Sequence, residues 1–174
     1  KIQLIYYSIM QKKKILENTQ ILNKIKRISL QIIESNLDCS KIIICGIEKN
    51  GALLAEIICK ELNLISKKNI IFCSMKINKL TPTENIQLSI DINECKDQSV
   101  VIVDDVLNSG KTLTYAVKHF LDIEIESIKT AVLVNRSHKK FPISADFKGI
   151  NLSSSLQNHV DVVFTKDKIE AFLF

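Results

Sequence analysis

Hydrophobic residues along the chain follow two kinds of spacing, one typical of helices and one typical of strands. Isoleucines three and four residues apart predict an amphipathic helix over about residues 18–36: Ile21, Ile25, Ile28 and Ile32. Short apolar runs without that spacing predict buried strands over residues 41–47, 69–77, 100–103, 127–134 and 160–165. Helix-like runs are also expected over about residues 52–62 and 113–121. The strands and helices alternate, which predicts an α/β fold with a mostly parallel central sheet flanked by helices.

Other segments have weaker patterns. Residues 78–85 are polar and contain Pro82, so we predict a mobile loop there. Apolar and polar residues then alternate over 86–92, which predicts a half-exposed antiparallel or edge strand. We expect the lysines at 12–14 to form a solvated segment and residues 166–174 to form an apolar-ended tail.

The stretch with the strongest chemical signal is residues 100–112, VVIVDDVLNSGKT. Its four β-branched residues predict a strand buried on both faces, and Asp104 and Asp105 follow where that strand should reach the surface. A small polar turn then leads into the next predicted helix. A strand end, a glycine-containing turn and a helix N-terminus together form an anion site, because main-chain N–H groups and the helix dipole converge there. The turn adds two hydroxyl donors and a glycine that allows close approach of the backbone: Ser109, Thr112 and Gly110.

Two other interpretations compete for this stretch. The ending Gly-Lys-Thr suggests a nucleotide-triphosphate P-loop, but that motif requires a glycine five residues before Gly110, where the chain has Asp105. Two carboxylates at that place would repel a triphosphate, so we reject the P-loop. The second interpretation is an ordinary strand–turn–helix unit with solvated acids, and the residue pattern by itself leaves it open.

An earlier strand, tight turn and helix offer a second anion site. The turn is Glu48-Lys49-Asn50-Gly51, between the strand over 41–47 and the helix expected from about Ala52. Ligands of open α/β sheets gather at the carboxyl ends of the strands, so two such loops on neighbouring strands would hold the two ends of one polyanion. A plain turn is the alternative for these four residues taken alone.

Composition limits the class of protein. The chain has 174 residues, 46% hydrophobic and 25% charged, which predicts one globular domain over residues 1–174. Its apolar runs fall short of a membrane helix and its start lacks a signal-peptide cleavage site, so we expect no membrane association and a cytoplasmic location. Its five cysteines lack C-x-x-C spacing and predict buried thiols of a reducing compartment. The net charge of +5 permits an acidic ligand or RNA.

The order of residue types in 100–112 resembles the phosphoribosyl-pyrophosphate (PRPP) motif of type I phosphoribosyltransferases. The resemblance implies the fold of that family, with a flexible lid over about 78–85, a small C-terminal hood, Mg²⁺ as cofactor and a homodimer. It implies that the ribose hydroxyls are held by two catalytic acids, Asp104 and Asp105. It assigns the 5′-phosphate to Asn108, Ser109, Gly110, Lys111 and Thr112. It assigns the pyrophosphate to Glu48, Lys49, Asn50 and Gly51.

Three later segments resemble the PyrR branch of this family: residues 133–138, 141–143 and 145–149. That branch pairs uracil phosphoribosyltransferase activity with attenuation of pyrimidine operons through RNA. The resemblance spans about residues 14–164 and leaves about residues 1–13 as a non-family N-terminal extension. It implies transfer of phosphoribose from PRPP to uracil, giving UMP and pyrophosphate, with the base held by Val134, Asn135 and Arg136.

Two amides favour a pyrimidine over a purine as the accepting base. The purine branch has an aspartate in place of Asn108 and a lysine in place of Asn135. An amide offers a donor and an acceptor to a uracil edge, but it cannot act as a base near neutral pH.

The chain also departs from the PyrR pattern. Its first loop has Glu-Lys-Asn-Gly where the branch has Lys-Thr-Arg-Gly, so the arginine that meets pyrophosphate is missing and a carboxylate is added. Its lid opens on Lys-Ile-Asn-Lys, residues 76–79, instead of Tyr-Arg-Asp-Asp. These changes leave open a catalytically weak regulatory protein that senses PRPP or a nucleotide. RNA binding is the weakest interpretation, since family positions with a basic residue or a histidine are here Leu30, Ser144 and Ile150.

Overall fold

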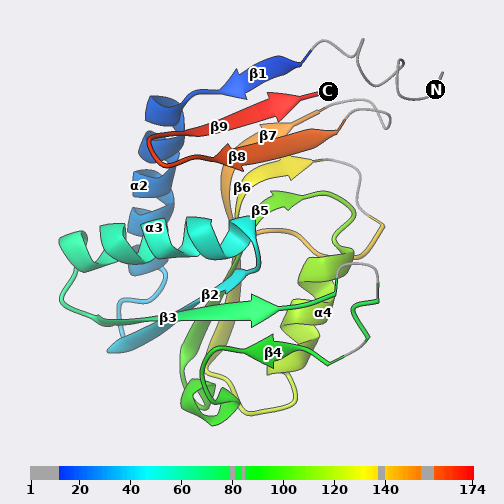
Figure 1. Cartoon of the computed structure of the whole chain (residues 1–174). Helices are drawn as coiled ribbons and strands as arrows, with labels where there is room; N and C mark the ends of the chain where they lie inside the picture. Colours follow the sequence, from blue (N-terminus) through cyan, green and yellow to red (C-terminus); the bar gives the residue numbers. More distant parts are fainter. Residues whose placement is uncertain (1–11, 79–80, 84, 137–139, 154–158) are drawn as a thin grey trace.

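A six-stranded sheet forms the middle of the molecule (Figure 1), whose computed structural model describes residues 12–78, 81–83, 85–136, 140–153 and 159–174. The strand order is β4-β3-β2-β5-β6-β7. The strands are β2 (Lys41–Ile47), β3 (Asn69–Lys76), β4 (Gln87–Leu88), β5 (Ser99–Leu107), β6 (Ser127–Arg136) and β7 (Phe147–Leu152). All neighbours pair in parallel except β3 and β4, which confirms the mostly parallel sheet expected from the apolar runs.

Helices cover both faces of this sheet. α2 (Asn18–Glu34) and α3 (Asn50–Ile65) pack on one face, and α4 (Lys111–Phe120) packs on the other. Side chains alternate along β2, so Ile44 contributes to the core under α2 and α3, whereas Cys45 contributes to the core under α4. Because both faces are covered, the strands are apolar along most of their length, as a parallel sheet requires.

A second sheet, of three antiparallel strands, lies at the end of the molecule where the chain terminates (Figure 1). We call it the hood; it consists of β1 (Lys13–Leu16), β9 (Ile169–Leu173) and β8 (Val160–Phe164), in that order. The lysines expected to be solvated at 12–14 are exposed, but Lys13 and Lys14 begin strand β1, and the tail expected at 166–174 contains strand β9. β1 and β9 come from the two ends of the described chain and pair with each other, and Ile169 and Ala171 of β9 are buried.

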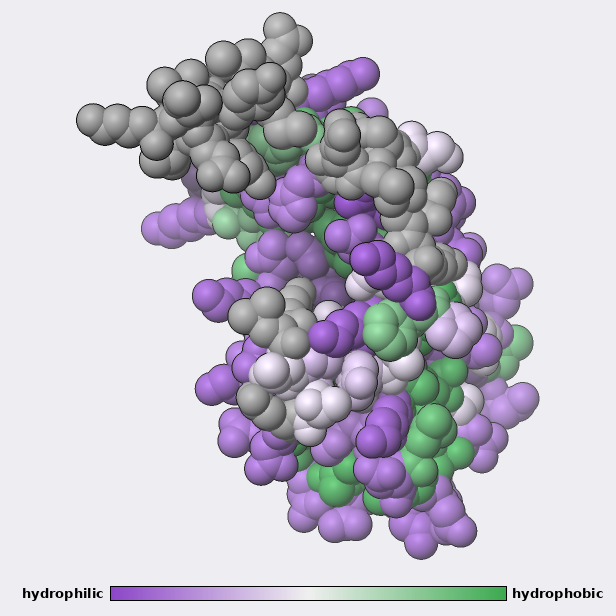
Figure 2. Space-filling model, turned by 90° about the vertical axis from the view of Figure 1, so that its right-hand side faces the viewer, coloured by the Kyte–Doolittle hydropathy of each residue, from purple (hydrophilic) through white to green (hydrophobic). Residues whose placement is uncertain are grey.

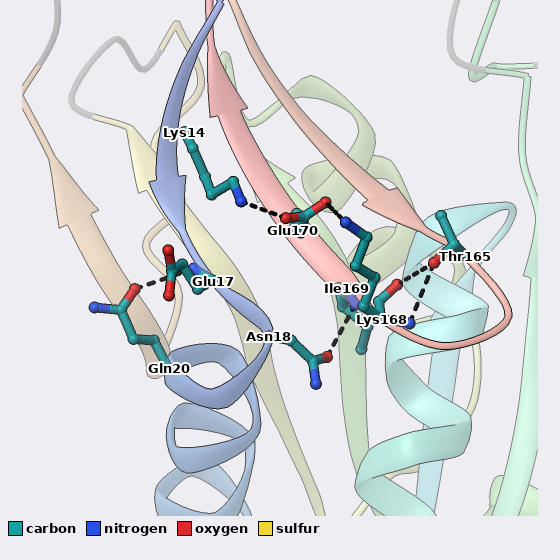
Figure 3. Close-up of polar contacts among 8 residues, drawn as sticks. All are labelled: Lys14, Glu17, Asn18, Gln20, Thr165, Lys168, Ile169 and Glu170. Atoms are coloured by element: carbon teal, nitrogen blue, oxygen red, sulfur yellow. Dashed lines mark hydrogen bonds and ion pairs between the residues drawn. The ribbon is translucent and has the colours of Figure 1, made fainter.

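Polar contacts hold the hood together and fasten it to the start of α2 (Figure 3). Asn18 Oδ1 accepts a hydrogen bond from the main-chain N–H of Ile169 at 2.9 Å. Glu170 on β9 lies between two lysines, with Lys14 Nζ at 2.6 Å and Lys168 Nζ at 2.9 Å. The hydrogen bond with Lys14 lowers the pKa of Glu170, and the same contact raises the pKa of Lys14. These contacts hold strands from distant parts of the sequence in one unit.

Two helix boundaries differ from the sequence predictions. α4 ends at Phe120, so Leu121 leaves the helical spacing and is 66% exposed instead of buried. α3 begins at Asn50 instead of Ala52 and continues to Ile65. The earlier start brings part of the first loop into the first turn of the helix.

The edge strand expected over 86–92 is much shorter than its alternating residues suggest. Only Gln87–Leu88 pair with β3, as an antiparallel edge. Asp91 Oδ1 accepts a hydrogen bond from Asn93 N at 2.9 Å and begins a 3-10 helix over Ile92–Cys95. The local capping contact therefore ends the extended conformation.

The remaining predictions concern the class of protein. All five cysteines are free, and all except Cys39 are buried. No described helix is both long and apolar enough to cross a membrane. Of the N-terminal extension expected over 1–13, residues 1–11 lie outside the described residues, and Lys13 begins β1.

Candidate functional site

The two acids of the central stretch lie inside β5. The strand continues to Leu107, so Asp104 and Asp105 do not follow it at the surface as the sequence suggested. They are only 5% and 9% exposed, and Asp104 Oδ1 accepts a hydrogen bond from Asp105 N at 3.0 Å. Two carboxylates in a largely buried setting exert strong electrostatic effects on anything that binds beside them.

A pocket of about 320 Å³ opens above these acids. Residues 104–113 line most of it, and four further residues complete it, one on β6 and three at the start of β8: Val132, His159, Val160 and Asp161. The face of the molecule that carries the carboxyl ends of the strands is largely hydrophilic and is hollowed between its upper and lower parts (Figure 2). All five residues assigned to the 5′-phosphate therefore surround one cavity together with both acids.

The loop after β5 is fixed by its glycine. Gly110 has φ +83° and caps α4, and a Cβ atom there would lie 2.7 Å from Ile143 Cγ2. Main-chain N–H groups of Lys140 and Phe141 donate to Ser109 O at 2.8 and 3.1 Å, which holds the loop from outside. The first helical hydrogen bond runs from Thr114 N to Gly110 O, so the N-terminus of α4 faces the pocket with its dipole positive. This arrangement suits a phosphate.

The loop after β2 lies beside the loop after β5, as expected of loops that follow neighbouring parallel strands. Glu48 and Lys49 are exposed there, and the peptide bond between them is cis. A second pocket, of about 390 Å³, is lined by this loop together with Ile77 and Asp105. Asp105 therefore borders both pockets.

Gly51 explains how closely the two loops approach. A Cβ atom at this position would lie 2.7 Å from Val103 O and 3.0 Å from Asp104 Cα. Only a glycine lets the first turn of α3 rest against the end of β5 at this distance. The side chain of its neighbour Asn50 then reaches Asp105, with Nδ2 2.8 Å from Oδ2.

The residues assigned to the base lie at the end of β6, next to β5, but do not line the pocket above the two acids. Val134 is fully buried in the core. Asn135 Nδ2 donates to Asn151 Oδ1 at 2.7 Å, and Arg136 Nη1 donates to Asn108 Oδ1 at 3.0 Å. Burial lowers the pKa of Arg136. Arg136 thus reaches the pocket through Asn108, and the base-binding roles stay predictions.

Sequence reasoning missed the contribution of the hood. His159, Val160 and Asp161 line the pocket above the two acids, although only a strand was expected from residue 160. Their spacing resembles that of any half-exposed strand, so no local signal marked them. Of the segments assigned to the lid and to the PyrR resemblance, residues 79–80, 84 and 137–139 lie outside the described residues.

The donor atoms of the site suit a hard cation only in part. Within the described residues, no cluster of three or more histidines, cysteines, aspartates or glutamates is placed to hold a metal ion. Asp104 and Asp105 provide carboxylate oxygens beside open space. This set fits Mg²⁺ that takes most of its ligands from a bound phosphate compound and water.

Comparisons with a family model and with known proteins indicate the same family. The family model described as "Phosphoribosyl transferase domain" matches residues 11–165. The Bifunctional protein PyrR of Haemophilus ducreyi is 30% identical over 156 residues, which cover 85% of this chain and 87% of that protein. The Bifunctional protein PyrR of Clostridium botulinum (strain Eklund 17B) is 33% identical over 163 residues, 89% of this chain and 91% of that protein.

Solved structures show the same fold at lower sequence identity. A hypoxanthine phosphoribosyltransferase of Trypanosoma cruzi aligns with a TM-score of 0.74 at 16% identity, over 91% of this chain and 95% of that chain. A hypoxanthine phosphoribosyltransferase of Staphylococcus aureus aligns with a TM-score of 0.70 at 18% identity, over 85% and 80%. Both structures share the arrangement of sheet and helices with this chain.

Proposed function

The chain belongs to the type I phosphoribosyltransferase family, with relatives in the PyrR branch, and from this premise we propose that it transfers phosphoribose from PRPP to uracil. The products would be UMP and pyrophosphate. One observation carries the proposal: two anion loops flank one buried pair of acids, and Asp105 borders the pockets of both loops. PRPP has the matching order, with a phosphate at one end, a pyrophosphate at the other and a ribose between them.

Each part of the site then has a role. Asp104 and Asp105 hold the ribose hydroxyls, and the loop over 108–112 binds the 5′-phosphate. The loop over 48–51 faces the pyrophosphate with Lys49 and main-chain N–H groups. Val134, Asn135 and Arg136 would meet the base at the end of β6, and residues 159–161 of the hood would cover it.

The chemistry requires little from the protein beyond position and charge. When the bond from C1 to pyrophosphate weakens, positive charge develops on the ribose ring. Asp104 and Asp105 lie in a water-poor setting, where fixed negative charge stabilises that ring strongly. Mg²⁺, held by these two acids with oxygens of PRPP and water, would neutralise the charge of the leaving pyrophosphate. The hood would keep water away from C1 until the base nitrogen attacks.

Two amides support a pyrimidine as the accepting base. Asn108 Oδ1 accepts a hydrogen bond from Arg136, so the side chain at this position is fixed and lacks a basic atom. Asn135 is fixed in the same way by Asn151. Neither residue can take a proton from a purine ring, whereas an amide edge matches the donors and acceptors of uracil.

A regulatory protein that senses PRPP or a nucleotide is the second candidate. It is favoured by Glu48, an exposed carboxylate at the loop that would meet pyrophosphate. In either case we propose one domain over residues 1–174, a homodimer and a cytoplasmic location, with RNA as the least favoured partner.

The test is release of pyrophosphate from PRPP and Mg²⁺, with uracil, hypoxanthine, guanine, xanthine and orotate offered separately. Release with uracil alone is the expected result. Release with a purine would overturn the choice of base. No release with any base, from protein that binds PRPP, would favour the sensor.

A further inference from the structure

We propose that Asn50 is a positioning residue that joins Asp105 to the hood. Its side chain fixes both the orientation of the Asp105 carboxylate and the position of the hood beside the site. The part of this inference that concerns PRPP rests on the proposed function. The link between the acid and the hood is a property of the protein without substrate.

The geometry uses the whole donor capacity of the amide. Asn50 Nδ2 lies 2.8 Å from Asp105 Oδ2 and 2.9 Å from the main-chain O of Val162. A primary amide nitrogen carries two hydrogens, and two bonds consume both. The three residues belong to α3, β5 and β8, so the amide joins a helix start, a strand of the main sheet and a strand of the hood.

The residue type fits this role and few others do. A carboxylate has no hydrogen to donate, and a hydroxyl has one, so neither reproduces the pair of bonds. Asn50 is half-buried, and Gly51 keeps the start of α3 against β5. The short side chain of Asn50 therefore has little freedom to move. Because both hydrogens are committed, the amide does not replace an arginine as a donor to pyrophosphate. Anion binding at this loop falls to Lys49 and the main chain.

The consequence is that ligand binding at Asp105 is coupled to the position of the hood. A hydrogen bond from the amide holds the Asp105 carboxylate in one orientation before ligand arrives, which reduces the ordering cost of binding. The same amide restrains Val162, only one residue after the lining residue Asp161. A shift of Asp105 toward a bound ribose is therefore transmitted to the hood.

The chain offers a matched control. Asn18 also anchors the hood through its side chain, since its Oδ1 accepts from Ile169 N at 2.9 Å (Figure 3). It lies on α2 and does not line either pocket of the site. Asn18→Ala should loosen the hood without disturbing Asp105, whereas Asn50→Ala should do both.

The experiment compares the native chain with Asn50→Ala, Asn50→Asp and Asn18→Ala. Amide hydrogen exchange over residues 160–164, without substrate, measures the hold on β8. We expect Asn50→Ala to raise exchange there roughly fivefold, as the loss of one net hydrogen bond predicts. Titration calorimetry with PRPP and Mg²⁺ measures the affinity of the site for PRPP. We expect about tenfold weaker binding in Asn50→Ala and less than about twofold change in Asn18→Ala.

Asn50→Asp separates positioning from simple loss of structure, because it preserves the shape of the side chain. Near neutral pH it adds a third carboxylate to the pair Asp104 and Asp105 and cannot donate, so PRPP binding should be weak. As the pH falls, the introduced carboxyl takes up a proton and can donate again, so binding should recover relative to the native chain. If turnover is measured, KM for PRPP should rise more than kcat falls.

The outcomes divide clearly. Unchanged exchange over 160–164 in folded Asn50→Ala would overturn the link to the hood. Equal loss of PRPP affinity in Asn18→Ala and Asn50→Ala would overturn the role at Asp105, because a loose hood alone would then explain both. Failure of the native chain to bind PRPP would refute the proposed function and the role of Asn50 at a PRPP site. The link to the hood would still be decided by the exchange experiment.

Discussion

The two anion loops of the site are built differently, although both join a parallel strand to a helix at the same edge of the sheet. The loop after β5 has small polar residues, a glycine with positive φ and external hydrogen bonds from residues 140 and 141. The loop after β2 exposes Glu48 and turns its amide, Asn50, inward to Asp105. The first is equipped to bind a phosphate, whereas the second carries a negative charge where an anion should lie. The proposed phosphate end and the proposed pyrophosphate end of the site are therefore separable by mutation.

The largest effect is expected from a change to the pair of acids that lies between the two loops. Asp104→Asn with Asp105→Asn keeps the shape of both side chains but removes the charges that we propose hold ribose. We expect PRPP affinity to fall by on the order of 100-fold or more, as the loss of two charged contacts predicts. Titration calorimetry checks this. Asp38→Asn with Asp167→Asn, two exposed positions, removes the same charge and should leave affinity unchanged.

A smaller effect breaks the loop after β5 alone. Gly110→Ala forces φ +83° on a residue with a Cβ atom and brings that atom to 2.7 Å from Ile143 Cγ2. The strain should cost about 1–2 kcal/mol of stability and weaken binding of ribose 5-phosphate. Adding Ile143→Ala should restore part of the loss by removing the clash. Full restoration by that second change would mean that the backbone conformation itself is not important.

A still smaller effect is expected from a change in the loop after β2. Glu48→Gln removes the exposed carboxylate beside the proposed pyrophosphate site and should strengthen PRPP binding roughly two- to fivefold, with a greater gain at low salt. Glu56→Gln, a change at an exposed position on α3, the helix that follows this loop, is the control and should have no effect. Weaker binding by Glu48→Gln would mean that this carboxylate contributes a favourable contact instead of repulsion.

The smallest effect concerns the hood. The contact with Lys14 holds the pKa of Glu170 below its ordinary value of 4.5, so its stabilisation is complete above that value and is lost as the pH falls through the lower, folded-state value. Thermal unfolding between about pH 6 and about pH 3 should therefore show the native chain losing more stability than Glu170→Gln. Parallel loss in both proteins would exclude this ion pair as the cause.

The sequence predicted best what is encoded by neighbouring residues. Residues 100–112 contain a strand, acids, loop and helix start in one run, and the structure gathers them around one pocket. Long-range contacts left no such local signal. Nothing near Asn50 indicates that its amide reaches Val162, which is 112 residues away.

The hood shows the same limit for the fold. Its strands β1 and β9 are short and come from opposite ends of the described chain, so pairing and not periodicity makes them strands. The lysines at 12–14 are exposed as expected, but the ion pair of Lys14 with Glu170 leaves no signal in either segment alone. The burial of Asp104 and Asp105 was missed for a related reason, since β6 pairs with β5 beyond both acids, as far as Leu107.

The central claim is that the two loops and the acid pair form one site for PRPP, and competition binding tests it most directly. Titration calorimetry of the native chain with PRPP and Mg²⁺ should give one molecule bound per chain. Ribose 5-phosphate should compete by filling the loop after β5, and pyrophosphate should compete separately by filling the loop after β2. Absence of PRPP binding, or PRPP binding that neither half-ligand reduces, would contradict the account.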